Sequence, residues 1–183
     1  MTEEKHVSLD IEACGEVLLS IGACEFDPLT GQTDNPFYVV VEAQPQIDAG
    51  LRMDGGAFNW WLKQSDGARA AIATVPAARP PDSLEALRRW WPDRNAWCWA
   101  YPTSYDLPVI ARVAARFEVK PPWKWQRTMC GRTLWQLACM VDPKMAEIEK
   151  VANPAAHHAL ADAQEQAEWY AKYLSTFSMG GRS

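Results

Sequence analysis

Two carboxylates near the start of the chain are spaced to hold a cation. Asp10 and Glu12 lie in the segment Val7–Glu12, where apolar residues alternate with polar ones. This period of two is that of a β-strand with one apolar face, and it places both carboxylates together on the other face. Neighbouring carboxylates repel each other unless a cation lies between them, and hard divalent ions prefer oxygen ligands. Alone, the pair favours an edge strand with a solvated acidic face over a metal site.

Three further groups change that balance. Asp106 follows a segment typical of a buried strand, Trp97–Ala100, and precedes a helical pattern. It is therefore expected near the carboxyl end of a strand, where open α/β sheets place their chemistry. His157 and Asp162 stand where the last amphipathic helix begins. Together the five residues predict a metal-centred hydrolase site, and the combination is far more specific than any of its parts.

The three motifs resemble those of the DEDDh group of 3′–5′ exonucleases. The first motif of that group, Asp-x-Glu, matches Asp10 and Glu12, and the second, an aromatic residue followed by Asp, matches Tyr105–Asp106. The third, His-x-Ala-Leu-x-Asp-Ala, matches His157–Ala163. The likeness covers the chain from about Val7 to Tyr173. Within the group, the chain is most similar to small bacterial and phage exoribonuclease-like members, through the segments Leu19–Ala23, Trp60–Ser65 and Arg132–Leu134.

The resemblance implies a two-metal-ion mechanism. Two Mg²⁺ or Mn²⁺ ions about 4 Å apart activate water and stabilise the leaving 3′ oxygen in such enzymes. The ligands would be Asp10, Glu12, Asp106 and Asp162. His157 would be the general base, because an imidazole accepts a proton near neutral pH.

The substrate expected from the resemblance is single-stranded or 3′-overhanging nucleic acid, with RNA favoured over DNA and nucleoside 5′-monophosphates as products. Relatives are often dimers, so a homodimer is a possible assembly. Two other functions are alternatives: a ribonuclease H-like endonuclease or nucleotidyl transferase, and a catalytically weak nucleic-acid-binding module of the same fold. The histidine five residues before the last motif aspartate disfavours the first. Retention of all five chemical groups disfavours the second.

His157 is distinguished from its neighbour by motif spacing. Five residues on an ideal helix turn about 140° beyond a full turn, so His157 and Asp162 would not share a helix face. His157 is therefore predicted in the loop before the helix, which Asn153–Ala156 allows. His158 is expected to shape that loop, and His6 to be a strand residue with no catalytic role.

A basic strip could bind the nucleic-acid backbone. Six basic residues and one acidic residue lie between Arg112 and Arg132, a local charge of +5 in a chain whose net charge is −5. Trp123 and Trp125 interrupt the strip, and aromatic rings among cations can stack bases. A solvated helix face followed by a proline-rich loop is the equally weighted alternative. The predicted nucleic-acid contacts are Lys124, Arg127, Arg132, Trp61 and Tyr105. For Trp60 and Trp61 the favoured alternative is that one ring packs on the core and the other covers it, since buried aromatic rings outnumber stacking platforms.

Composition indicates a soluble globular protein. The 183 residues are 48% hydrophobic and 22% charged, which fits one domain over residues 1–183. No run of about 18 apolar residues predicts a membrane span, and Met1–Lys5 has no signal-peptide pattern. The five cysteines are odd in number and lack Cys-x-x-Cys spacing, which favours reduced thiols in the cytoplasm over disulfides or a zinc site.

The pattern of the chain predicts the elements that must hold the site. Three strands joined by turns predict an antiparallel meander: Lys5–Ile11, Val17–Phe26 and Phe37–Glu42. Helix and strand then alternate, which gives an α/β fold of the ribonuclease H-like kind, with a mixed sheet (the antiparallel meander plus parallel strands) flanked by helices. Two later strands are expected, over Ala96–Ala100 and Gln126–Cys130. One helical region is expected over 54–74, broken near Gln64–Ser65, and a second helix runs from an Asp82/Glu85 capping box to Trp91. Further helices are expected over Asp106–Phe117 and Arg132–Met140 and after Asn153–Pro154.

Overall fold

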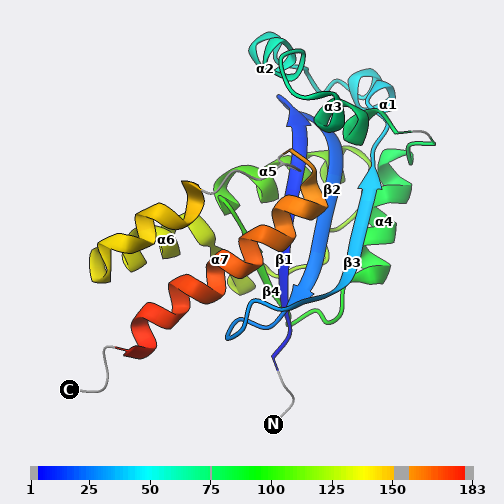
Figure 1. The fold of residues 1–183 in the computed structure, drawn as a ribbon. Coiled ribbons are helices and arrows are strands. Elements are labelled where there is room, and N and C mark those ends of the chain that lie inside the picture. The colour runs from blue at the N-terminus through cyan, green and yellow to red at the C-terminus, as the bar shows by residue number, and fades with distance from the viewer. Residues whose placement is uncertain (1–3, 75, 151–156, 180–183) are drawn as a thin grey trace.

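The computed structural model describes residues 4–74, 76–150 and 157–179 and has one mixed sheet between helices (Figure 1). The strand order is β3-β2-β1-β4-β5; the first three strands are antiparallel, and β1, β4 and β5 are parallel. The predicted α/β mixed sheet is therefore confirmed. Its strands are β1 (His6–Cys14), β2 (Val17–Phe26), β3 (Thr33–Val40), β4 (Trp97–Ala100) and β5 (Thr128–Cys130).

Apolar and polar side chains alternate along β1, and a separate hydrophobic core lies on each face of the sheet. Val7, Leu9 and Ile11 belong to a core with apolar residues of α4 (Pro80–Trp90) and α5 (Thr103–Arg116). A second core combines sheet residues with those of α6 (Gly131–Val141) and α7 (Ala159–Met179), and α7 crosses β1 and β2 in Figure 1. Because successive strand residues point to opposite faces, the carboxylates of β1 are directed toward α7.

Two short helices lie beyond the carboxyl end of β1. The predicted break in 54–74 is confirmed, with α2 over Gly55–Trp61 and α3 over Asp66–Ala73. Ser65 ends the connection as the N-cap of α3, its side chain accepting the backbone N–H of Ala68. The indole N–H of Trp61 donates to the carbonyl of Ala13 at 3.0 Å, which ties α2 to the end of β1.

Several boundaries differ from the prediction. β3 starts at Thr33 rather than Phe37, since an edge strand tolerates Pro36. The predicted Asp82/Glu85 capping box is wrong: α4 already begins at Pro80, and its N-cap, Arg79, makes no side-chain capping bond. Proline is favoured in the first helical turn because the missing N–H would have no partner there.

The remaining elements connect these layers. A short helix, α1 (Gln44–Asp48), was not predicted; its buried Gln46 exchanges hydrogen bonds with both backbone groups of Leu18. Two 3₁₀ segments, η1 (Trp125–Arg127) and η2 (Pro143–Lys150), flank β5 and α6. The predicted loop Asn153–Ala156 lies outside the described residues. Among the described helices, none is long and apolar enough to cross a membrane.

Candidate active site

The first two carboxylates lie side by side on β1, facing α7. Asp10 pairs with Gly22 of β2 and Glu12 pairs with Ser20, and both acidic side chains are buried. The register shifts immediately after Glu12, where β1 bends toward its turn. Glycine at position 22 leaves room for the start of α7 to approach this part of the sheet. The solvated acidic edge expected from the Asp-x-Glu pattern alone is therefore wrong, because β1 is an interior strand.

Asp106 follows β4, the strand that pairs in parallel with β1. It stands in the first turn of α5, which begins at Thr103 rather than at Asp106 as predicted, and β4 ends just before it at Ala100. Its side chain is 3% exposed, and its Oδ2 atom has no hydrogen-bond partner among the described residues. A buried carboxylate oxygen without a donor is costly, so this atom points to an absent ligand such as a cation.

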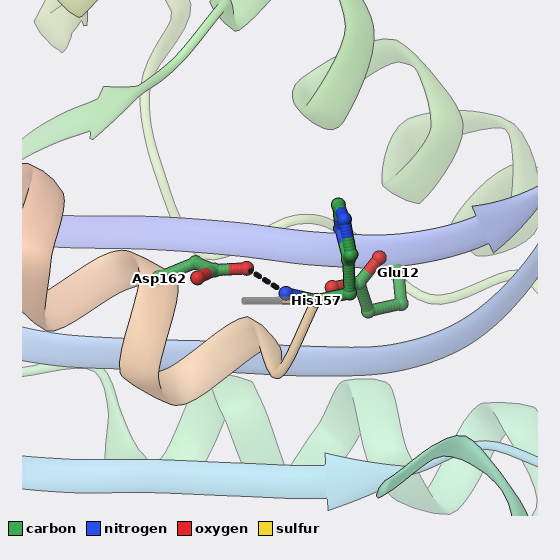
Figure 2. A group of neighbouring side chains, drawn as sticks. All are labelled: Glu12, His157 and Asp162. Atoms are coloured by element: carbon green, nitrogen blue, oxygen red, sulfur yellow. Dashed lines mark hydrogen bonds between the residues drawn. The ribbon is translucent and has the colours of Figure 1, made fainter. Parts of the chain in front are cut away.

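His157 and Asp162 come from the start of α7. His157 precedes the first helical residue, Ala159, and has a φ of 68°, so its predicted place before the helix is confirmed. Its backbone N–H donates to Oδ2 of Asp162 at 2.9 Å. Ligand atoms of Glu12, His157 and Asp162 all lie within 4.8 Å of one another (Figure 2).

The electrostatics favour a bound cation. Burial, then the charges of Asp106 and Glu12, raise the pKa of Asp10 well above its usual value. Burial, then the charges of Asp162 and Asp106, raise the pKa of Glu12 to about 8, and burial raises the pKa of Asp106 to about 8. Burial also raises the pKa of Asp162. Burial, and for Asp10 and Glu12 the neighbouring carboxylates, thus disfavour the ionised forms, and a divalent cation would offset both effects, so this all-oxygen set of carboxylates fits a hard divalent cation.

A buried amide supports the cluster and was missed by the sequence analysis. The Gln166 amide nitrogen donates to Oδ1 of Asp10 at 2.8 Å, and the Tyr170 hydroxyl donates to the Gln166 amide oxygen at 3.0 Å. Residues four apart share a helix face. The spacing Asp162, Gln166, Tyr170 could therefore have identified this polar stripe on α7.

Aromatic rings surround His157. The Trp60 ring meets the imidazole edge-to-face, with a centroid distance of 4.7 Å. Trp60 is 43% exposed, whereas Trp61, the residue selected as a nucleic-acid contact, is only 5% exposed. The structure thus places Trp60, not Trp61, where a substrate base could reach a ring. This separation matches the alternative in which one tryptophan packs on the core and the other covers it.

Two of the predicted nucleic-acid contacts lie beside the site. Tyr105 directly precedes Asp106 in α5, and its ring is half-exposed; burial followed by the charge of Asp106 raises its pKa. Arg132, in the first turn of α6, has its guanidinium carbon 5.4 Å from the centroid of the Tyr101 ring. Its charge lowers the pKa of Asp106, which puts it within electrostatic reach of the cluster.

Lys124 and Arg127 lie at the other end of the parallel strands. Arg127 donates to Glu4 at 2.9 Å, just before β1, and its guanidinium covers the Trp97 ring at the start of β4. Lys124 donates to the side-chain oxygen of Asn95 at 2.7 Å. At about 3.3 Å per strand residue, His6 at the amino end of β1 is about 13 Å from Asp10. Of the three basic residues predicted as nucleic-acid contacts, Arg132 is therefore the one that lies near the carboxylates.

Comparisons with known proteins agree with this arrangement. No curated protein matches the chain. A family model described as the 3′–5′ exoribonuclease Rv2179c-like domain matches residues 5–174, from the start of β1 through most of α7. Because the match covers all the elements that carry the five motif residues, the chain belongs to this family of 3′–5′ exoribonuclease domains.

Proposed function

We propose that the chain is a metal-dependent 3′–5′ exonuclease that uses two Mg²⁺ or Mn²⁺ ions, with RNA as its preferred substrate. Membership of the exoribonuclease family already makes it an exonuclease hydrolase. The observation that supports the metal dependence is the cluster of the buried Asp10, Glu12 and Asp106 with the half-buried Asp162, in which Asp106 contributes an oxygen without a partner among the described residues.

The four carboxylates would hold the ions directly or through water. When bound, the ions supply an activated water and stabilise the charge on the leaving 3′ oxygen. Asp10 and Glu12 are fixed by the sheet, and Asp162 is fixed by its hydrogen bond from the His157 backbone. Because each acid comes from a packed element, the ligands need little reorganisation when the cation enters.

His157 would accept the proton of the attacking water. A ring nitrogen of His157 lies within 4.8 Å of carboxylate oxygens of Glu12 and Asp162, so a water held between these carboxylates would lie within reach of the imidazole. The edge-to-face contact with Trp60 restricts the rotation of the imidazole ring. The backbone hydrogen bond to Asp162 keeps the residue beside the cluster even though it lies outside the helix.

The surroundings favour a single-stranded 3′ end. Trp60 and Tyr105 present partly exposed rings beside the cluster, and an unpaired base can stack on such rings whatever its identity. Arg132 supplies a cation for a phosphate near the scissile bond. A paired terminal base could not reach the rings without unpairing, so single-stranded or 3′-overhanging RNA or DNA would be cut stepwise to nucleoside 5′-monophosphates.

The test is a digestion of labelled oligonucleotides. RNA and DNA strands carrying a 3′ label are incubated with Mn²⁺, with and without a chelator, beside strands with a blocked 3′ end and a circular strand. Stepwise loss of label as a mononucleotide, abolished by chelator and by Asp10→Ala, is expected. Cleavage of the circular strand would instead favour the endonuclease, and binding without cleavage would favour the catalytically weak binding module.

A further inference from the structure

A chain of two hydrogen bonds connects the aromatic core to the first carboxylate. Tyr170, fully buried, donates to the oxygen of the Gln166 amide, and the nitrogen of the same amide donates to Oδ1 of Asp10. Gln166 is buried as well. Neither side chain belongs to the motifs that carry the proposed chemistry.

The position of the Tyr170 hydroxyl is set by close packing. Its ring stacks on Trp99 with a centroid distance of 5.2 Å and lies 5.9 Å from the ring of Phe26. A Cβ atom at Gly131 would lie only 2.2 Å from the Tyr170 ring, so glycine is required there for the ring to fit. A ring enclosed on several sides presents its hydroxyl in one direction.

The ionised Asp10 carboxylate and the Tyr170 hydroxyl together select the orientation of the Gln166 amide. A side-chain amide has a donor end and an acceptor end of nearly the same shape, so packing alone selects neither orientation. Donation by Tyr170 occupies the oxygen end, and the nitrogen end is then turned toward the carboxylate. The reverse orientation would place the amide oxygen against a carboxylate oxygen, two acceptors with no proton between them.

We propose that Gln166 is a positioning residue for Asp10 and that Tyr170 acts through Gln166. The inference rests on the proposed metal-dependent function: the amide holds Oδ1 of the Asp10 carboxylate in one orientation, and Oδ2 would then be the oxygen that binds an ion. A donor to the ionised carboxylate also favours its charged, metal-binding form. Replacing a residue that hydrogen-bonds to a metal ligand without touching the metal typically lowers metal affinity by roughly 10–100-fold.

Calorimetric titration with Mn²⁺ tests this hydrogen-bond relay, from Tyr170 through Gln166 to Asp10, without a substrate. Gln166→Met keeps the length and volume of the side chain but removes the donor, and Tyr170→Phe keeps the packed ring but removes the hydroxyl. We expect Gln166→Met to weaken Mn²⁺ binding by roughly 10–100-fold, and Tyr170→Phe to weaken it by a smaller factor. In the double variant, Tyr170→Phe should add nothing, because the group through which it acts is gone.

Asp10→Ala is the reference variant that separates the proposed metal site from the proposed positioning role of Gln166. If Asp10→Ala loses Mn²⁺ binding while Gln166→Met binds as the unmodified protein does, the positioning role is wrong and the metal site stands. Unchanged binding in Asp10→Ala would overturn both. An equal loss from Tyr170→Phe with and without Gln166 would show that the hydroxyl acts independently. If Gln166→Met fails to fold, Tyr170→Phe alone still decides, since unchanged affinity there would overturn the relay.

Discussion

Gly22 lies so close to the start of α7 that a Cβ atom on it would stand 2.1 Å from the backbone nitrogen of Leu160. In the register of the sheet, Gly22 is also the partner of Asp10. The absence of a side chain at this one position therefore brings the helix that carries Asp162 down onto the strand that carries Asp10. The spacing between carboxylates from the two ends of the sequence depends on it.

Gly22→Ala should separate the two halves of the site. The backbone of α7 cannot yield without moving His157 and Asp162, so we expect activity to fall at least tenfold and unfolding free energy to fall by about 1–3 kcal/mol, as in other overpacked cores. Steady-state kinetics and chemical denaturation measure the two effects. Gly67→Ala in α3 is the control, because its Cβ would meet nothing closer than 3.9 Å. Equal behaviour of the two variants would contradict the steric argument.

The two adjacent histidines should differ sharply. His157→Ala is expected to lower kcat by roughly 10²–10⁴-fold, the usual worth of a general base. The His158 ring stacks on Tyr38 at a centroid distance of 4.3 Å, and it is His157 whose ring nitrogen lies among the ligand atoms of Glu12 and Asp162, so His158→Ala should mainly lower the unfolding temperature. Rates measured at saturating metal, together with melting curves, distinguish the two. A larger loss of kcat at position 158 would overturn the assigned register of the third motif.

The buried carboxylates predict a falling stability with rising pH in the metal-free protein. The pKa values of Glu12 and Asp106 are raised to about 8 in the folded state, whereas unfolded carboxyl groups titrate near about 4. Between these limits the folded chain binds more protons than the unfolded chain, so the free energy of unfolding falls as pH rises from about 4 through about 8. Mg²⁺ or Mn²⁺ replaces those protons, so its stabilising effect should grow over the same range.

Melting curves from pH 5 to 9, with chelator and with Mn²⁺, check this dependence. Asp106→Asn is the matched variant: it should raise the metal-free unfolding temperature near pH 8, flatten the pH dependence and reduce the effect of Mn²⁺. A shift of a few degrees is measurable, since about 1 kcal/mol moves the midpoint by roughly 2–4 °C in a chain of this size. A metal effect that does not change with pH would argue that the ion binds elsewhere.

The sequence was informative where local pattern and structure coincide. The alternation in Val7–Glu12 correctly predicted which residues face the core, and Ser65 correctly marked the break between α2 and α3. It was uninformative where a contact depends on distant elements. Gln166 meets Asp10, a residue separated from it by 156 positions, and the polar spacing on α7 marks a helix face without showing which carboxylate that face meets.

The two tryptophans illustrate the same limit and give a further prediction. Adjacent helix residues point in different directions, and only the packed helix shows which ring is covered. Trp61→Ala should lower the free energy of unfolding by about 3–5 kcal/mol, the usual cost of removing a buried aromatic ring. Trp60→Ala should be much less destabilising but should impair turnover, because it exposes and releases His157. Chemical denaturation and steady-state kinetics of both variants check this prediction. A larger loss of stability in Trp60→Ala would contradict the assignment of Trp61 as the buried ring.

The basic residues provide the last test, because the structure separates residues that are close in sequence. Arg132 influences Asp106, whereas Lys124 and Arg127 bind Asn95 and Glu4 at the amino ends of the strands. For a short oligonucleotide, Arg132→Ala should therefore raise KM several-fold, while the combined Lys124→Ala and Arg127→Ala variant should match the unmodified chain. For strands that extend more than about 13 Å from the carboxylates, the distal pair should strengthen binding, and this added affinity should fall as salt rises, since each phosphate contact releases counterions. A length-independent effect of the distal pair would show that these residues act on the fold and not on the strand.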